Sequence, residues 1–221
     1  MKRKFGGIAA AALFALAALG ATSASAATEF GDNCIGDEAT ESVPLTLFAL
    51  TANESPLPLA APSAGVITKW KSNLIPVPVT IPQTLKVLRQ TGPNTVQIVG
   101  EAPGNITGGA NIFDARIPVQ AGDRLGLFGS SPIGTLFCEI SGPNALGVFE
   151  GGGSPGQTVL FTPFTSELRV PVAAILEPDA DNDGFGDETQ DLCPSDANTV
   201  KACRVPPETT ITKKPKKKDA K

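Results

Sequence analysis

The sequence predicts an all-β fold, a β-sandwich or jelly roll, followed by a short acidic loop segment and a disordered tail. Apolar and polar residues alternate with a period of two, as in Phe113 to Val119, which is typical of half-buried strands. The 23 glycines and 20 prolines separate such segments at short intervals. About nine or ten short strands in this arrangement, without a long helical period, favour a sandwich.

Residues 1–26 are predicted to be a secretory signal peptide. They combine a basic start at 2–4, an apolar run at 8–19 and a small-residue cleavage site at Ala24-Ser25-Ala26. The mature chain is then expected to begin near Ala27. It should be secreted, either extracellular or associated with the cell envelope.

The sandwich is predicted over residues 44–177. Its predicted strands are Leu45–Leu50, Gly65–Lys71, Leu85–Arg89, Val96–Val99, Phe113–Val119, Leu125–Phe128, Leu136–Ile140, Val148–Phe149, Val159–Phe161 and one long alternating run, Leu168–Leu176. The segment 103–109 is rich in Gly and is expected to be a turn. The Pro-rich segment 75–82, Pro118 and Pro171 are expected at sheet edges, because Pro cannot donate to a ladder.

Four cysteines in an exported chain predict two disulfides, for which three connectivities are open. Cys193 and Cys203 are close in sequence and flank a polar turn, so we predict that they pair. That leaves Cys34 with Cys138. The second bridge would hold down residues 27–43, a polar N-terminal arm that we expect to be loosely structured.

A run of regularly spaced acids follows the predicted sandwich. Asp179, Asp181 and Asp183 stand at every second position, and Gly184 permits a sharp bend directly after them. A hard cation such as Ca²⁺ takes about six to eight oxygen ligands, and carboxylates at this spacing in a tight loop can all face inward. The run therefore predicts a calcium loop.

The first half of this loop fits the start of an EF-hand-type loop. In that register the backbone carbonyl of Phe185 and the side chain of Asp187 take the seventh and ninth positions. The second half does not fit, because Gln190 stands where an EF-hand places a bidentate Glu, and no amphipathic helix precedes the loop.

Residues 178–203, with C-P at Cys193-Pro194, resemble the thrombospondin type 3 calcium repeat, whose pattern is D-x-D-x-D-G-x-x-D followed by an acid and C-P. We predict that one Ca²⁺ is held by Asp179, Asp181, Asp183, Phe185, Asp187 and Asp191. Asp191 lies one residue later than the pattern requires. Gln190 or a water is therefore an alternative ligand.

The segments G-V-I-T-K-W-K (65–71) and I-P-V-Q-A-G-D-R-L-G-L (117–127), together with the acidic loop, resemble a family of exported actinobacterial proteins. Those proteins place a β-sandwich of unassigned function before one calcium repeat. The resemblance implies architecture and localisation, and it implies no activity.

The charge is unevenly distributed along the chain. Removal of the leader lowers the net charge from −4 to −7, whereas residues 213–221 alone carry six Lys and one Asp. The acidic remainder argues against nucleic acid as a partner. Residues 204–221 are predicted to be a disordered Lys-rich tail, which can make weak contact with an anionic cell envelope.

The composition also restricts the chemistry. These 221 residues contain no His and no Tyr, which excludes a Ser-His-Asp or Cys-His arrangement and His-based zinc catalysis within them. We expect a non-enzymatic calcium-binding module for adhesion, with a surface glycan or an extracellular protein as its ligand. The alternative is a secreted carbohydrate-active enzyme that uses a carboxylate pair. Its candidate acids are Glu101, Asp114, Asp123, Glu139, Glu150 and Glu167, and nothing in their spacing selects a pair.

Overall fold

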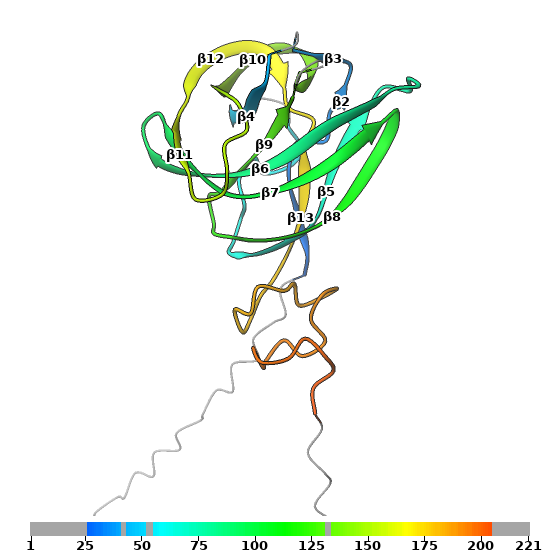
Figure 1. Cartoon of the computed structure of the whole chain (residues 1–221), viewed down its shortest axis with the longest axis vertical. Coiled ribbons are helices and arrows are strands. Elements are labelled where there is room, and N and C mark those ends of the chain that lie inside the picture. The colour runs from blue at the N-terminus through cyan, green and yellow to red at the C-terminus, as the bar shows by residue number, and fades with distance from the viewer. Residues whose placement is uncertain (1–25, 41–42, 52–54, 131–133, 205–221) are drawn as a thin grey trace, which may run out of the picture.

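The computed structural model describes residues 26–40, 43–51, 55–130 and 134–204. These residues form thirteen strands and no helix, arranged as a sandwich, which confirms the predicted all-β class (Figure 1). The predicted leader, apart from Ala26, and the predicted tail beyond Arg204 lie outside the described residues. Among the described residues, no helix is long and apolar enough to cross a membrane.

Two sheets make up the sandwich. The smaller sheet has the order β1 (Thr28–Gly31), β13 (Ala173–Glu177), β5 (Gly65–Leu74) and β8 (Gly109–Val119), all antiparallel, with β2 (Ile35–Gly36) parallel to the end of β5. The larger sheet has the order β11 (Thr158–Leu160), β7 (Thr95–Thr107), β6 (Thr80–Gly92), β9 (Arg124–Gly129), β4 (Leu45–Thr51), β10 (Leu136–Glu150) and β12 (Thr162–Arg169), and β3 (Glu38–Ala39) pairs with β10.

The main core lies between the two sheets. It combines Ile67 and Trp70 of the smaller sheet with Leu85 and Leu127 of the larger one, and all four side chains are fully buried. A second apolar cluster packs on the opposite face of the larger sheet, around Phe48, Leu88, Val96, Ile98, Phe149 and Phe161. Adjacent residues of the same strand therefore serve different cores, as the period of two requires.

Residues 28–31 form strand β1 rather than part of a loose arm, which corrects the prediction for 27–43. β1 pairs with β13 along its whole length, and Phe30 is fully buried. Asp32, directly after the strand, makes a buried bidentate ion pair with Arg169. Phe30 is the one large apolar side chain in β1, so hydrophobic periodicity could not indicate the strand.

The long hairpin of β6 and β7 also differs from the prediction. β7 continues to Thr107, through most of the segment 103–109 that was expected to be a turn, because the first half of β6 pairs with it there. Pro82 lies opposite Asn105, before the second neighbour β9 begins its pairing at Gln83. The proline therefore sits where β6 has one neighbouring strand instead of two.

The alternating run 168–176 is one segment in sequence but two strands in space. β12 ends at Arg169 in the larger sheet, β13 begins at Ala173 in the smaller sheet, and Val170-Pro171-Val172 crosses between them. Pro118 lies on β8, which has β5 as its only partner among the described strands of its sheet, so the predicted edge position is confirmed.

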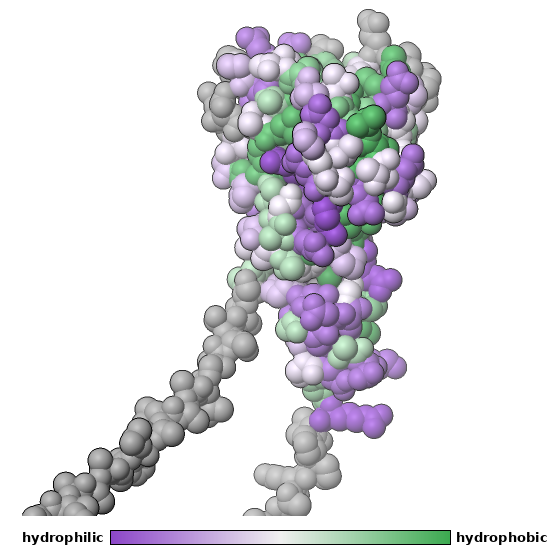
Figure 2. Space-filling model, turned by 90° about the vertical axis from the view of Figure 1, so that its left-hand side faces the viewer, coloured by the Kyte–Doolittle hydropathy of each residue, from purple (hydrophilic) through white to green (hydrophobic). Residues whose placement is uncertain are grey.

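Both predicted disulfides are present, Cys34–Cys138 and Cys193–Cys203. The first joins the segment after β1 to β10, and such bridges are typical of extracellular proteins. After the lower end of β13, residues 178–204 form a compact segment that lies below the sandwich in Figure 1. This narrower part of the molecule exposes mostly hydrophilic residues (Figure 2).

Candidate metal centre

The structure brings three of the predicted ligands together directly below β13. Asp179, Asp181 and Asp183 each offer a carboxylate oxygen, and these oxygens lie within 4.8 Å of one another. All three residues are partly buried. Because like charges at this separation repel one another, the cluster is a site at which a cation would be stabilised.

The carboxylates also shape the backbone of the loop. Asp179 accepts hydrogen bonds from the backbone amides of Asp183 and Gly184, both at 3.1 Å, and Asp183 accepts one from Phe185 at 2.9 Å. Asn182 and Gly184 have φ values of 62° and 83°, in the left-handed region that Asn and Gly tolerate best. The chain can therefore wrap around the acids with its amides turned toward them.

Asp187 and Asp191 come from the second half of the loop. The carboxylate of Asp187 accepts hydrogen bonds from the amide of Ala180, which ties the two halves together. Asp191 is only 2% exposed, and its Oδ1 accepts a 2.8 Å bond from the amide of Cys193. The sequence spacing had left the place of Asp191 open.

Two carboxylate oxygens of the loop are buried without a hydrogen-bond partner among the described residues, Oδ2 of Asp181 and Oδ2 of Asp191. Desolvation raises the pKa of Asp181 and of Asp187, and the charges of neighbouring aspartates, Asp191 among them, raise both pKa values further. Asp191 therefore belongs to the cluster electrostatically. A buried carboxylate oxygen without a donor is costly, and a bound cation would supply the missing partner.

Gln190, the alternative ligand, uses both ends of its amide elsewhere. Its Nε2 donates to the carbonyl of Ala115 on β8 at 2.8 Å, and its Oε1 accepts a 3.4 Å bond from the amide of Gly186. The ring of Phe185 lies under the guanidinium of Arg116, 4.3 Å from its Cζ. The carbonyl of Phe185 remains a predicted ligand.

Sequence reasoning missed Glu177, the last residue of β13. Glu177 is 2% exposed, and its carboxylate accepts four hydrogen bonds, from Thr68, Glu188 and Thr189. Burial alone would raise the pKa of Glu177, but the bonds from Thr189, Thr68 and Glu188 outweigh burial and hold that pKa below its ordinary value. Its one sequence signal was its position directly before the acidic run.

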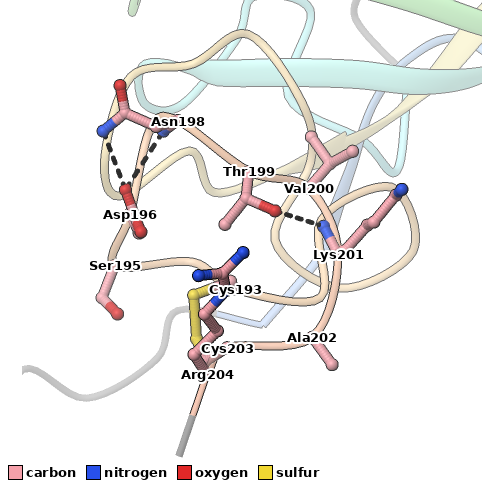
Figure 3. Close-up of a pocket in the computed structure, with 10 residues that line it drawn as sticks. All are labelled: Cys193, Ser195, Asp196, Asn198, Thr199, Val200, Lys201, Ala202, Cys203 and Arg204. Atoms are coloured by element: carbon pink, nitrogen blue, oxygen red, sulfur yellow. Dashed lines mark hydrogen bonds between the residues drawn. A yellow bond between two sulfur atoms is a disulfide. The ribbon is translucent and has the colours of Figure 1, made fainter.

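Beyond the acids, the chain closes a second loop with the Cys193–Cys203 disulfide, around a hollow of about 940 Å³ (Figure 3). Asp196 accepts hydrogen bonds from the backbone and side chain of Asn198, and Thr199 accepts one from the amide of Lys201. These polar contacts and the disulfide lie within the loop and fix its shape. The hollow is separate from the aspartate cluster.

Three candidate acids of the alternative, enzymatic hypothesis are ion-paired with three different bases. Glu101 binds Lys86, Asp114 binds Lys69 at 2.7 Å, and Asp123 binds Arg89 at 2.7 Å. Asp123 also accepts a bond from the amide of Gln120 in the turn before β9. These carboxylates are thus engaged in contacts that hold strands and a turn.

Comparison with models of protein families, with curated proteins and with solved structures returned no match. The geometry of the acidic loop is therefore the basis for a functional proposal.

Proposed function

We propose that this protein is a secreted or cell-surface, non-enzymatic module that binds one Ca²⁺ in the loop 179–191 and serves in adhesion. The calcium assignment depends most on two buried carboxylate oxygens that have no hydrogen-bond donor among the described residues. One belongs to Asp181, within the aspartate cluster, and the other to Asp191, whose charge acts on that cluster. Oxygen-only ligands in a short wrapped loop suit Ca²⁺ better than a soft metal or Mg²⁺.

The ligand set follows from the contacts of each side chain. Asp179, Asp181 and Asp183 supply the clustered oxygens, and Asp187 and Asp191 close the site from the second half of the loop. Asp191 is preferred to Gln190, since the Gln190 amide is bonded to Ala115 and Gly186. With the Phe185 carbonyl, the set reaches the lower end of calcium's usual coordination number.

Calorimetric titration with Ca²⁺ tests this assignment. The wild type should bind one ion with a Kd of about 10⁻⁴–10⁻³ M, the range of extracellular modules, and Mg²⁺ should compete poorly. Asp183→Ala should abolish binding, whereas Glu167→Gln, which removes an exposed acid on β12, should leave it unchanged. Equal heats from wild type and Asp183→Ala, or no heat at millimolar Ca²⁺, would end the calcium assignment.

Adhesion through a surface glycan or an extracellular protein is supported by the predicted export, the two disulfides and the absence of His and Tyr from the sequence. A glycan array read together with a turnover assay separates adhesion from the enzymatic alternative. Binding without turnover supports the module. Saturable hydrolysis of a glycan by the pure protein would favour the carbohydrate-active enzyme instead.

A further inference from the structure

Glu177 joins the calcium loop to the sandwich through a buried carboxylate. Its Oε1 accepts bonds from the hydroxyls of Thr68 on β5, at 2.8 Å, and of Thr189 in the loop, at 2.7 Å. Its Oε2 accepts bonds from the amides of Glu188 and Thr189, at 3.0 and 2.9 Å. One carboxylate thus holds the central strand of the smaller sheet and the second half of the loop.

Glu177 is not available as a calcium ligand. An ionised carboxylate has about four lone-pair sites, and protein donors occupy a matching number here. Its effect on calcium must therefore be indirect, through the positions of Asp187 and Asp191, which lie on either side of the segment it binds.

Other contacts fix the same half of the loop against the same sheet. Gly186 is buried and packs closely against Glu177 and Thr68. A Cβ added at Gly186 would lie 2.5 Å from both Glu177 Oε2 and Thr68 Cγ2. Gln190 reaches the carbonyl of Ala115 on β8, and Phe185 packs under Arg116 of the same strand. Strands β5, β8 and β13 all contact the loop, so the loop is not a free tether.

We propose that Glu177 is a positioning residue that couples calcium binding to the folding of the sandwich, so that Ca²⁺ stabilises the sandwich as well as its own loop. This inference rests on the proposed calcium site. If the loop keeps its second half in place only while the sandwich is folded, the ion binds the folded chain alone. By thermodynamic linkage, Ca²⁺ then stabilises the folded sandwich by a free energy proportional to ln(1 + [Ca²⁺]/Kd).

Trp70 provides a reporter that belongs to the sandwich alone. Trp70 is the one Trp of the sequence, which contains no Tyr. Trp70 lies on β5, and its side chain is fully buried in the main core. Its fluorescence during urea unfolding therefore reports the sandwich. At free Ca²⁺ ten times the calorimetric Kd, the ratio of folded to unfolded sandwich should rise about tenfold, which is about 1.4 kcal/mol.

Glu177→Gln keeps the shape of the side chain but removes its charge and one of its two acceptor oxygens. Whichever way the new amide is turned, either the amides of Glu188 and Thr189 or the hydroxyls of Thr68 and Thr189 lose their acceptor. The substitution should weaken calcium binding about tenfold or more and shrink the calcium-dependent shift of the Trp70 transition. A residue with a merely structural role would lower the transition equally with and without Ca²⁺. The control Glu167→Gln, on β12, should change neither the Kd nor the shift.

Thr68→Val is the second variant, in case Glu177→Gln does not fold. It keeps the β-branched shape and removes only the hydroxyl that binds Glu177, so the calcium-dependent shift should fall below that of the wild type. If the wild type binds Ca²⁺ by calorimetry but its Trp70 transition does not respond, the coupling is refuted and the calcium site stands. If calorimetry shows no binding, the calcium site itself fails.

Discussion

The buried ion pair between Asp32 and Arg169 makes a sharp prediction about stability. The side chains of Asp32 and Arg169 are 3% and 8% exposed, and both oxygens of Asp32 accept from the guanidinium. Oδ1 of Asp32 also accepts a 3.0 Å bond from the amide of Cys34. Asp32→Asn removes the countercharge and leaves a buried guanidinium, which typically costs about 3–5 kcal/mol.

An exposed pair in the same sandwich supplies the matched control. Asp114 binds Lys69 at 2.7 Å, but the Asp114 side chain is 89% exposed, so Asp114→Asn should cost only about 0–1 kcal/mol. Both losses of stability can be measured by urea unfolding without Ca²⁺, with the fluorescence of the buried Trp70 as the signal. With an m-value of about 2 kcal/mol/M, Asp32→Asn should lower the midpoint by about 2 M and Asp114→Asn by less than about 0.5 M.

Equal losses from the two substitutions would refute the reasoning, because burial is the main difference between the pairs. The double variant Asp32→Leu/Arg169→Met adds a second check. Replacement of a buried ion pair by apolar side chains of similar volume is often close to neutral, so the double variant should be more stable than Asp32→Asn alone.

Three further predictions concern the loop. Asp191→Asn should raise the calorimetric Kd for Ca²⁺ at least about tenfold, because the oxygen without a donor would become an NH₂ group. The apparent Kd should also rise as the pH falls. The pKa values of Asp181 and Asp187 are raised above the ordinary aspartate value of 3.8, so protons compete with Ca²⁺ for these carboxylates at a pH above 3.8. A calcium affinity that stays constant as the pH falls to 3.8 would contradict this prediction. The nitrogen of Ala27 donates to the carboxylate of Glu188, and cleavage before Ala27 would make this nitrogen a charged amine. Glu188→Gln should then destabilise the metal-free loop by about 0.2–1 kcal/mol, measured by hydrogen exchange. An unchanged exchange rate would argue against an ion pair between Ala27 and Glu188.

The sequence alone was sufficient for the class of fold and for both disulfides. Alternation in segments such as Phe113 to Val119 indicates a strand wherever one face is buried, and Cys193 and Cys203 are too close in sequence to favour other partners. Strand boundaries were less predictable. The segment 103–109 is punctuated by Gly and Pro, yet most of it is held in β7 by pairing with β6, which is a tertiary effect.

The clustering of three aspartates in the acidic loop was predictable from the sequence, but the attachment of the loop to the sandwich was not. Spacing identifies Asp179, Asp181 and Asp183, because all three lie in one short wrapped segment. The role of Glu177 depends on Thr68, which is 109 residues away, and that of Gln190 depends on Ala115, 75 residues away. No local sequence pattern indicates such contacts, so only the folded chain shows that the Gln190 amide is bonded to Ala115 and Gly186.

The central claim is that the loop below the sandwich binds calcium through its aspartates. A crystal structure of the protein grown with millimolar Ca²⁺, with anomalous difference density, tests it most directly. We predict one anomalous peak with ligand oxygens at about 2.3–2.6 Å, supplied by the side chains of Asp179, Asp181, Asp183, Asp187 and Asp191 and by the carbonyl of Phe185. Glu177 should still be bonded to Thr68. A cluster without a peak at that concentration, or a peak that leaves Asp191 uncoordinated, would contradict the account.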